Sequence, residues 1–183
     1  MLENDRKEDE LLAVRCQLGE PEAFDALITR WHEPLWRYLR RLTGDDDAAE
    51  EAIQDAWLRI LRGIPRLRDC GRVRPWLFGI ARRVVMDRLR ERYAEPARAF
   101  TEDVDVATED ESSDLEEELE LLQDELTRLR APEREVLVLF YLEELTLTEI
   151  ADVVGIPTGT VKSRLFRARK ALRDQLVRKG VKR

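Results

Sequence analysis

The sequence predicts an all-α fold of two small helical domains joined by an acidic flexible linker. Apolar residues recur every three or four positions through residues 1–93 and again through 115–183, which is the period of amphipathic helices. The intervening residues, 94–114, show no such period and are rich in acidic and small polar side chains. We therefore place the domain boundaries at these two points.

The charge of the chain is distributed unevenly. Charged residues make up 39% of the sequence, compared with about 25% in an average globular protein. Thirteen of the 39 acidic residues lie between 101 and 126, where no Lys or Arg occurs, so the remainder holds 32 basic and 26 acidic residues although the net charge is -7. Mutual repulsion of the carboxylates predicts an extended, disordered tether over 101–114.

Several functional classes are not expected. Two cysteines and one histidine provide neither a disulfide framework nor a zinc cluster, and neither a P-loop nor a Ser/His/Asp arrangement occurs. Seven of the first ten residues are charged, unlike a signal peptide, and the longest uncharged apolar run, 136–142, is too short to span a bilayer. We expect a cytoplasmic protein that is not an enzyme, uses no cofactor or metal, and does not insert into membranes.

The first domain is expected to begin with two helices. The first covers residues 8–18 and ends near Gly19. The second runs from 21 to 44 and contains Pro34, which is expected to kink or break it because proline lacks the N–H that a helix interior uses.

A third helix is expected over residues 45–63. Three aspartates, 45–47, stand at its start, where the helix dipole favours negative charge. One face is apolar and the other is acidic and amide-bearing. The polar face contains Glu50, Glu51, Gln54 and Asp55. Such a face suits a basic partner surface.

Arginine is concentrated between residues 59 and 92, which hold eleven Arg and three acidic residues. A loop is expected over 66–74, followed by a helix over 75–93. Trp76 and Phe78 stand among these arginines, and aromatic rings beside guanidinium groups can hold unstacked bases of single-stranded DNA. Each aromatic residue, taken alone, is better explained as a plain core residue, and the density of arginine is what favours the DNA interpretation.

The second domain is predicted to contain four helices, of which the last two form a helix-turn-helix over residues 146–173. Leucines at helical spacing mark the first helix, 115–129, and Pro132 opens the second, 133–143. Thr146 and Glu149 have the spacing of a capping box that starts the third helix, and Gly155 ends it.

The last helix is apolar on one face and basic on the other. Residues 158–183 hold ten Lys or Arg and one acidic residue, which favours DNA binding over a merely solvated charged face. In a helix-turn-helix, the second helix enters the major groove of DNA.

The motifs of the chain resemble those of the extracytoplasmic-function (ECF) sigma factors of bacterial RNA polymerase. Residues 22–42 resemble the first conserved region, and Ala49-Glu50-Glu51-Ala52-Ile53-Gln54-Asp55-Ala56-Trp57 resembles the helix that docks on the polymerase clamp. Arg74-Pro75-Trp76-Leu77-Phe78-Gly79-Ile80-Ala81-Arg82 resembles the segment that opens and reads the minus-ten element. Residues 155–164 resemble the reader of the minus-thirty-five element. Position 83 is Arg where the family often has Asn.

This resemblance implies a factor that binds core RNA polymerase through its clamp helices and flap, directs it to promoter DNA, and assists melting. Binding to both duplex and melted DNA is implied, as is an anti-sigma factor. The residues expected to contact the minus-thirty-five element are Thr158, Thr160, Lys162, Ser163, Arg164 and Arg167. Those expected to contact the minus-ten element are Arg66, Arg68, Asp69, Arg72, Arg74, Trp76, Arg82 and Arg83. The acidic face of 45–63 is expected to dock on the polymerase.

Two other interpretations stay open at this point. A response-regulator transcription factor also carries a helix-turn-helix after a segment like 132–137, but its receiver domain has strands, whereas residues 1–93 show helical spacing only. A partner-binding adaptor could use the basic faces to meet acidic proteins. Tight binding to core polymerase without DNA is required only of a sigma factor.

Overall fold

The computed structural model describes residues 2–94, 126 and 128–178, and every regular element within these residues is helical. The predicted all-α fold is therefore confirmed for this part of the chain. The chain divides into two compact units, one centred on α1 to α4 and the other on α6 and α8. The acidic tether and the helix predicted over 115–129 lie outside the described residues, except for the last few positions of that helix.

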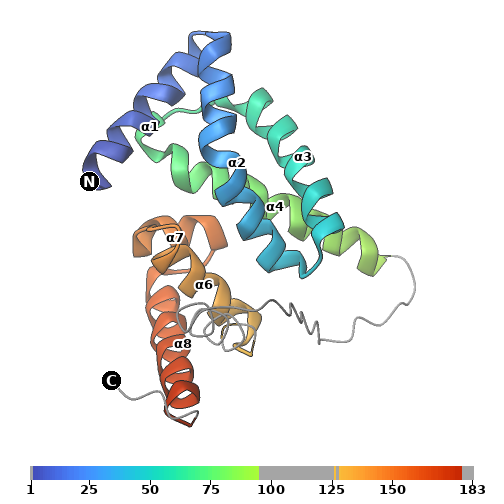
Figure 1. Ribbon diagram of the computed structural model, residues 1–183, viewed down its shortest axis with the longest axis vertical. Coiled ribbons are helices and arrows are strands. Elements are labelled where there is room, and N and C mark those ends of the chain that lie inside the picture. The colour runs from blue at the N-terminus through green and yellow to red at the C-terminus, as the bar shows by residue number, and fades with distance from the viewer. Residues whose placement is uncertain (1, 95–125, 127, 179–183) are drawn as a thin grey trace, which may run out of the picture. The chain divides into compact units, whose positions relative to one another are not determined.

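The first unit consists of four α-helices and two short 3-10 helices. They are α1 (Leu2–Gln17), α2 (Pro21–Thr43), α3 (Asp46–Gly63), η1 (Ile64–Arg66), η2 (Cys70–Arg72) and α4 (Val73–Ala94). α1 begins six residues before its predicted start. Figure 1 shows α1 and α4 lying against α2, with α3 beside α2 and α4. Asp45 caps α3 by accepting a hydrogen bond from the Ala48 N–H at 2.7 Å.

The predicted break at Pro34 is wrong, because α2 continues through this residue. A proline inside a helix costs about 3 kcal/mol. Trp31 and Leu35 flank it on the face that the first unit buries, with 6% and 0% exposure. Burying one large apolar side chain contributes about 1.5–3 kcal/mol, so two such residues offset the cost of the proline. α2 ends at Gly44, whose φ of 73° is the left-handed conformation that favours glycine.

An aromatic cluster lies in the core of the first unit. Phe78 of α4 is fully buried and meets the rings of Trp31 and Tyr38 edge to face, with centroid distances of 6.0 and 5.2 Å. Phe78 is thus a core residue, as one of the two sequence interpretations held. Trp57 of α3 is 8% exposed and donates its indole N–H to Nδ1 of His32 at 3.2 Å.

The second unit contains α6 (Ala131–Tyr141) and α8 (Thr158–Arg178), and α7 (Leu147–Val154) lies between them in the sequence. The capping box is confirmed, since the Thr146 N–H donates to Oε2 of Glu149 at 2.7 Å and the Glu149 N–H donates to Oγ1 of Thr146 at 3.3 Å. Gly155 follows α7 with a φ of 75°. Both helices of the predicted helix-turn-helix are therefore present.

The core of the second unit forms where α8 packs on α6. Val161, Leu165 and Ala168 of α8 are at most 4% exposed. Their spacing of four and three residues fixes one face of α8 inward and leaves the opposite face to solvent. Among the described helices, none is long and apolar enough to cross a membrane.

Candidate nucleic-acid and polymerase interfaces

The outward face of α8 presents the residues predicted for duplex DNA. Lys162 and Ser163 are exposed, and Arg164 is half-buried. Thr158 and Thr160 lie in the first turn of α8, where the helix dipole makes the N-terminus attractive to phosphate. The Ser163 hydroxyl donates to the Gly159 carbonyl oxygen at 2.8 Å and keeps its lone pairs available as acceptors.

Arg167 differs from the other predicted residues because it is paired inside the unit. Its Nε lies 2.9 Å from Oε1 of Glu133 in α6, and the Glu133 side chain is only 11% exposed. The Arg167 side chain is 59% exposed. This residue therefore neutralises a largely buried carboxylate at the α6–α8 contact, whether or not it also reaches DNA.

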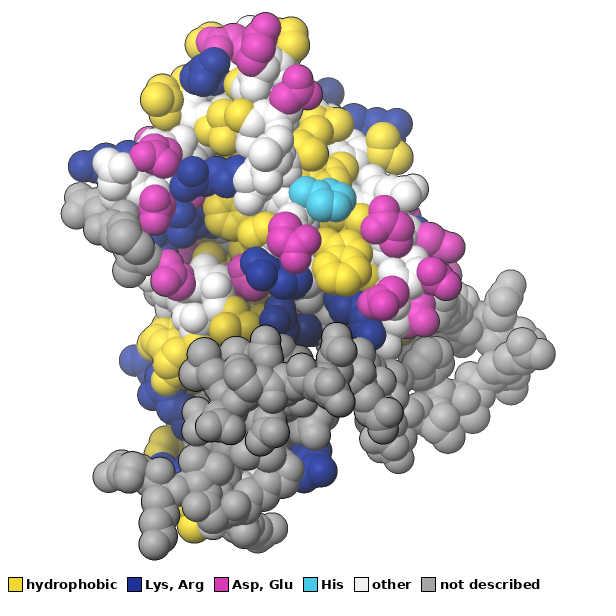
Figure 2. All heavy atoms as spheres, in the orientation of Figure 1, with side chains coloured by type: hydrophobic (Ala, Val, Ile, Leu, Met, Phe, Trp, Pro, Cys, Tyr) yellow, Lys and Arg dark blue, Asp and Glu magenta, His cyan; other side chains and the backbone are white. Residues whose placement is uncertain are grey.

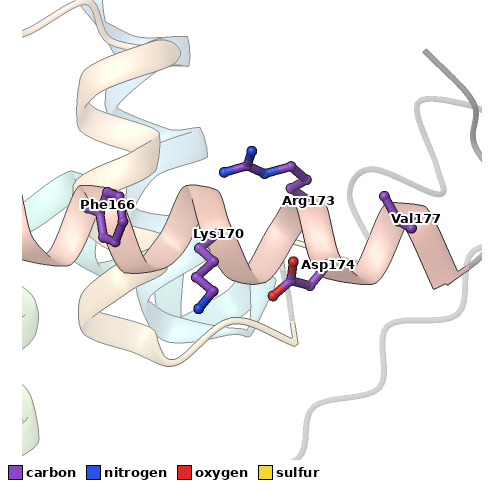
Figure 3. A pocket seen from close by; sticks show the side chains of 5 residues that line it. All are labelled: Phe166, Lys170, Arg173, Asp174 and Val177. Atoms are coloured by element: carbon purple, nitrogen blue, oxygen red, sulfur yellow. The ribbon is translucent and has the colours of Figure 1, made fainter.

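Phe166 is a surface feature of α8 that the sequence analysis missed. Its ring is 67% exposed, although phenylalanine is usually buried. Together with Lys170, Arg173, Asp174 and Val177 it lines an open depression along α8, as Figure 3 shows. Its position on the basic face, four residues after Lys162, was the available signal.

A second cationic contact joins α8 to α6. The Arg169 guanidinium carbon lies 5.4 and 5.3 Å from the ring centroids of Phe140 and Tyr141. Such cation–π contacts attach a basic side chain to an aromatic face. Arg169 thus contributes to the packing of the unit.

In the first unit, the segment predicted as an arginine loop consists of η1, a short extended piece and η2. The side chains of Arg66, Arg68 and Arg72 are exposed. Asp69 is also exposed, and its Oδ1 accepts the Gly71 N–H at 3.0 Å, which caps η2. The predicted loop is thus an ordered turn structure with arginines on its surface.

Arg74 does not share this exposure. It lies in the first turn of α4, is 9% exposed, and donates from Nε to the Asp9 carboxylate, which is itself 1% exposed. Its guanidinium also lies 5.3 Å from the centroid of the Trp31 ring. Asp9 accepts a further bond from Nε of Arg30 at 2.6 Å. We correct the expectation for Arg74, because a buried and paired guanidinium is not presented to DNA.

The remaining residues predicted for the minus-ten element lie along α4. Arg83 is exposed and donates from Nε to the Gly79 carbonyl oxygen at 2.9 Å, while Arg82 is half-buried. Trp76 is half-buried and packs so closely on Gly63 that a Cβ there would lie 2.9 Å from the ring. Part of the Trp76 side chain is therefore used in packing against Gly63.

One half of the polar face of α3 is paired with α4, and the other half is exposed. Arg88 of α4 binds Glu51 and Asp55, with nitrogen–oxygen distances of 2.8 and 2.6 Å. Desolvation lowers the pKa of Arg88, but the hydrogen bonds to Asp55 and Glu51 outweigh it and raise that pKa above its ordinary value. Glu50 and Gln54 are exposed and contact each other at 3.4 Å. Figure 2 shows one group of acidic side chains on the right of the view, with others at the top, on the left and near the centre.

Two family models match the chain, one in each unit. Sigma-70 region 2 matches residues 27–95, and Sigma-70, region 4 matches residues 119–172. The ECF RNA polymerase sigma factor SigW of Bacillus subtilis is 31% identical over 170 residues, which cover 86% of this chain and 91% of SigW. The chain belongs to the ECF sigma factors. Membership in this family favours a sigma factor over a response regulator or a partner-binding adaptor.

Further relatives support the assignment of this ECF sigma factor. The ECF RNA polymerase sigma factor SigL of Mycobacterium tuberculosis is 35% identical, with 90% of this chain and 95% of SigL covered. Among solved structures, the sigma factor RpoE from Bartonella quintana, in a co-crystal with the anti-sigma factor NepR, is similar with a TM-score of 0.71 and 26% identity. That match covers 87% of this chain and 98% of RpoE.

Proposed function

We propose that this sigma factor binds core RNA polymerase through α3, directs it to promoters through α8, and assists melting through the turn structure of η1 and η2. Family membership places the protein in transcription initiation. The observation that carries the finer proposal is that each unit presents its own basic surface. One surface has the geometry of a duplex reader, and the other has exposed arginines on an ordered turn.

Lys162, Ser163 and Phe166 are the residues best placed to read the minus-thirty-five element. Lysine can donate to O6 and N7 of guanine, and such a contact contributes about 1–3 kcal/mol of discrimination. The exposed Phe166 ring suits the apolar methyl group of thymine in the same groove. Thr158 and Thr160, at the start of α8, suit the phosphate backbone.

The exposed arginines of the turn structure are proposed to hold a base that leaves the minus-ten stack. Extruding a base costs a few kcal/mol, so the protein must supply contacts that the duplex lacks. Arg66 and Arg68 can contact phosphates and the flipped base, and Arg82 and Arg83 of α4 can contact the neighbouring backbone. Arg72 belongs to the same exposed group.

Glu50 and Gln54 form the part of the α3 face that is proposed to meet a basic surface of the polymerase clamp. Glu51 and Asp55 contribute charge there, although Arg88 already binds both. An anti-sigma factor that covered this face would silence the protein, and the Bartonella RpoE was solved in complex with an anti-sigma factor. A protein with these activities is proposed to act in the cytoplasm, where transcription occurs.

Transcription with purified core polymerase on a random promoter library tests the proposal. We expect the factor to bind core polymerase without DNA and to enrich promoters that share two elements. Lys162→Ala should relax base preference in the upstream element. The matched control, Arg173→Ala, lies further along the same helix and should weaken all sequences equally. A library without enriched elements would contradict the proposal.

A further inference from the structure

Gln17, the last residue of α1, is hydrogen-bonded to the turn structure that carries Arg66 and Arg68. Its Nε2 donates to the carbonyl oxygen of Ile64 at 3.0 Å and to that of Leu67 at 2.6 Å. Its Oε1 accepts from Sγ of Cys70 at 3.4 Å. Both Nε2 and Oε1 of the Gln17 amide are therefore hydrogen-bonded, and all three bonds go to the same segment.

The three partners of Gln17 lie at the start, the middle and the end of this segment. Ile64 is fully buried and opens η1, and Cys70 opens η2. The Ile64 carbonyl oxygen also accepts the Leu67 N–H at 3.1 Å, so the Gln17 amide reinforces a turn that the backbone closes. A segment held at two backbone carbonyl groups and one side chain leaves little freedom to the residues between them.

Arg66 and Arg68 are those intervening residues, and each flanks the Leu67 carbonyl that Gln17 holds. Both side chains are exposed, while the Leu67 side chain is half-buried. The bond to Leu67 therefore fixes the direction in which its two neighbours leave the surface. Binding groups that are fixed before binding lose less entropy when they engage a ligand.

We propose that Gln17 is a positioning residue for promoter reading, which holds the turn structure in the shape that engages the displaced minus-ten strand. This proposal rests on the function proposed above for Arg66 and Arg68. Gln17 precedes residue 27, where the Sigma-70 region 2 match begins, so the matched region does not contain it. Specificity in this chain would then depend on a residue of α1.

Two substitutions separate hydrogen-bond donation from side-chain size. Gln17→Met keeps an unbranched chain of similar length but removes both donors and the acceptor. Gln17→Lys restores donors toward the two carbonyl oxygens. Arg15→Met is the matched control, because Arg15 lies in the same last turn and pairs with Glu20 in an exposed salt bridge instead.

Each variant is tested as full-length protein in holoenzyme, on a promoter selected by the wild-type holoenzyme and on versions of it with single minus-ten changes. Gln17→Met should lower discrimination between these promoters about tenfold, the equivalent of about 1.4 kcal/mol, because all three bonds of the Gln17 amide are lost. A promoter already melted around the minus-ten element should show a smaller loss in opening rate, since extrusion is no longer required. Gln17→Lys should recover most of the discrimination, and Arg15→Met should behave as wild type.

Three further measurements decide whether Gln17 has a positioning role. Core affinity and minus-thirty-five preference should be unchanged in Gln17→Met, although the lost bonds lower the midpoint of thermal unfolding. If core affinity and minus-thirty-five preference fall together with that midpoint, Gln17 acts through general stability and the proposal is overturned. If Arg66→Ala and Arg68→Ala reduce minus-ten discrimination while Gln17→Met does not, the positioning role is overturned and the function of the turn stands. If none of them changes discrimination, the proposed function of the turn itself fails.

Discussion

The Nε of Arg167 lies 2.9 Å from Oε1 of Glu133, so an ion pair joins α8 to α6. The carboxylate is the more buried partner, at 11% exposure against 59% for the arginine. Removing the arginine would leave that carboxylate without its cation, and an unsatisfied buried acceptor costs about 1–3 kcal/mol. A loss of DNA binding on mutation of Arg167 therefore has two possible physical origins.

Arg167→Ala should lower the stability of the second unit by about 1–3 kcal/mol, because Glu133 loses its partner. Lys162→Ala, on the exposed face of the same helix, should change stability by less than about 0.5 kcal/mol. Chemical unfolding followed by circular dichroism gives both values. Adding Glu133→Ala to Arg167→Ala should restore part of the stability, and equal stability of the single variants would contradict a role for the ion pair.

Substitutions on α3 should separate docking from folding. Glu50→Arg should weaken binding to core polymerase without lowering the thermal midpoint, since Glu50 is exposed and its hydrogen bond with Gln54 is exposed as well. Asp55→Arg should lower both the affinity for core polymerase and the thermal midpoint, because it places a second cation beside Arg88. Asp25→Arg, an exposed change on α2, is the control. Normal core affinity in Glu50→Arg would exclude this face as the docking surface.

Asp9→Asn should destabilise the first unit strongly. Arg30, Arg74 and the Trp31 indole N–H all donate to this carboxylate, which is 1% exposed. Breaking a buried ion pair by neutralising one partner costs about 3–5 kcal/mol. Glu8→Gln is the control, because its pair with Arg30 is exposed and worth at most about 1 kcal/mol. Urea unfolding measures the difference, and similar losses in the two variants would contradict the central place of Asp9.

The thiols of Cys16 and Cys70 should react slowly with alkylating reagents in the folded protein. Desolvation raises the pKa of both thiols above 9.0, aided at Cys70 by Glu10 and Asp69. The unfolded chain releases these protons at about 9.0, so their contribution to stability is complete below that pH and is lost as pH rises through the higher folded values. Iodoacetamide labelling at pH 8 should be faster for unfolded than for folded protein, and Cys16→Ala isolates Cys70. Equal rates would refute a raised pKa.

Local signals explain which parts of the fold were predictable. Thr146 and Glu149 lie three residues apart, and their mutual capping depends on almost nothing else in the chain. Pro34 is the opposite case, since its local preference for a break is overridden by the burial of Trp31 and Leu35. The periodic spacing of apolar residues correctly predicted the buried face of α2. It did not show that the free energy gained by burying Trp31 and Leu35 would exceed the cost of a proline inside the helix.

The candidate site was predictable in outline and not in its pairings. The basic face of α8 follows from helical period alone, and Lys162 and Ser163 lie on it as expected. Arg74 differs from its exposed neighbours only because Asp9, 65 positions earlier, lies against it in the fold. A sequence contains no local sign of such a partner, so charge alone could not distinguish a DNA-contacting arginine from a buried one.

All four tryptophans, residues 31, 36, 57 and 76, belong to the first unit, and the indole rings of Trp31 and Trp57 are more than nine-tenths buried. Fluorescence that is excited selectively at tryptophan therefore comes from the first unit only. A shift of that emission to longer wavelength would record the opening of the aromatic cluster around Phe78 while the other unit stays optically silent. The two units can thus be followed separately in one unlabelled sample, with emission for the first and total helix content for both.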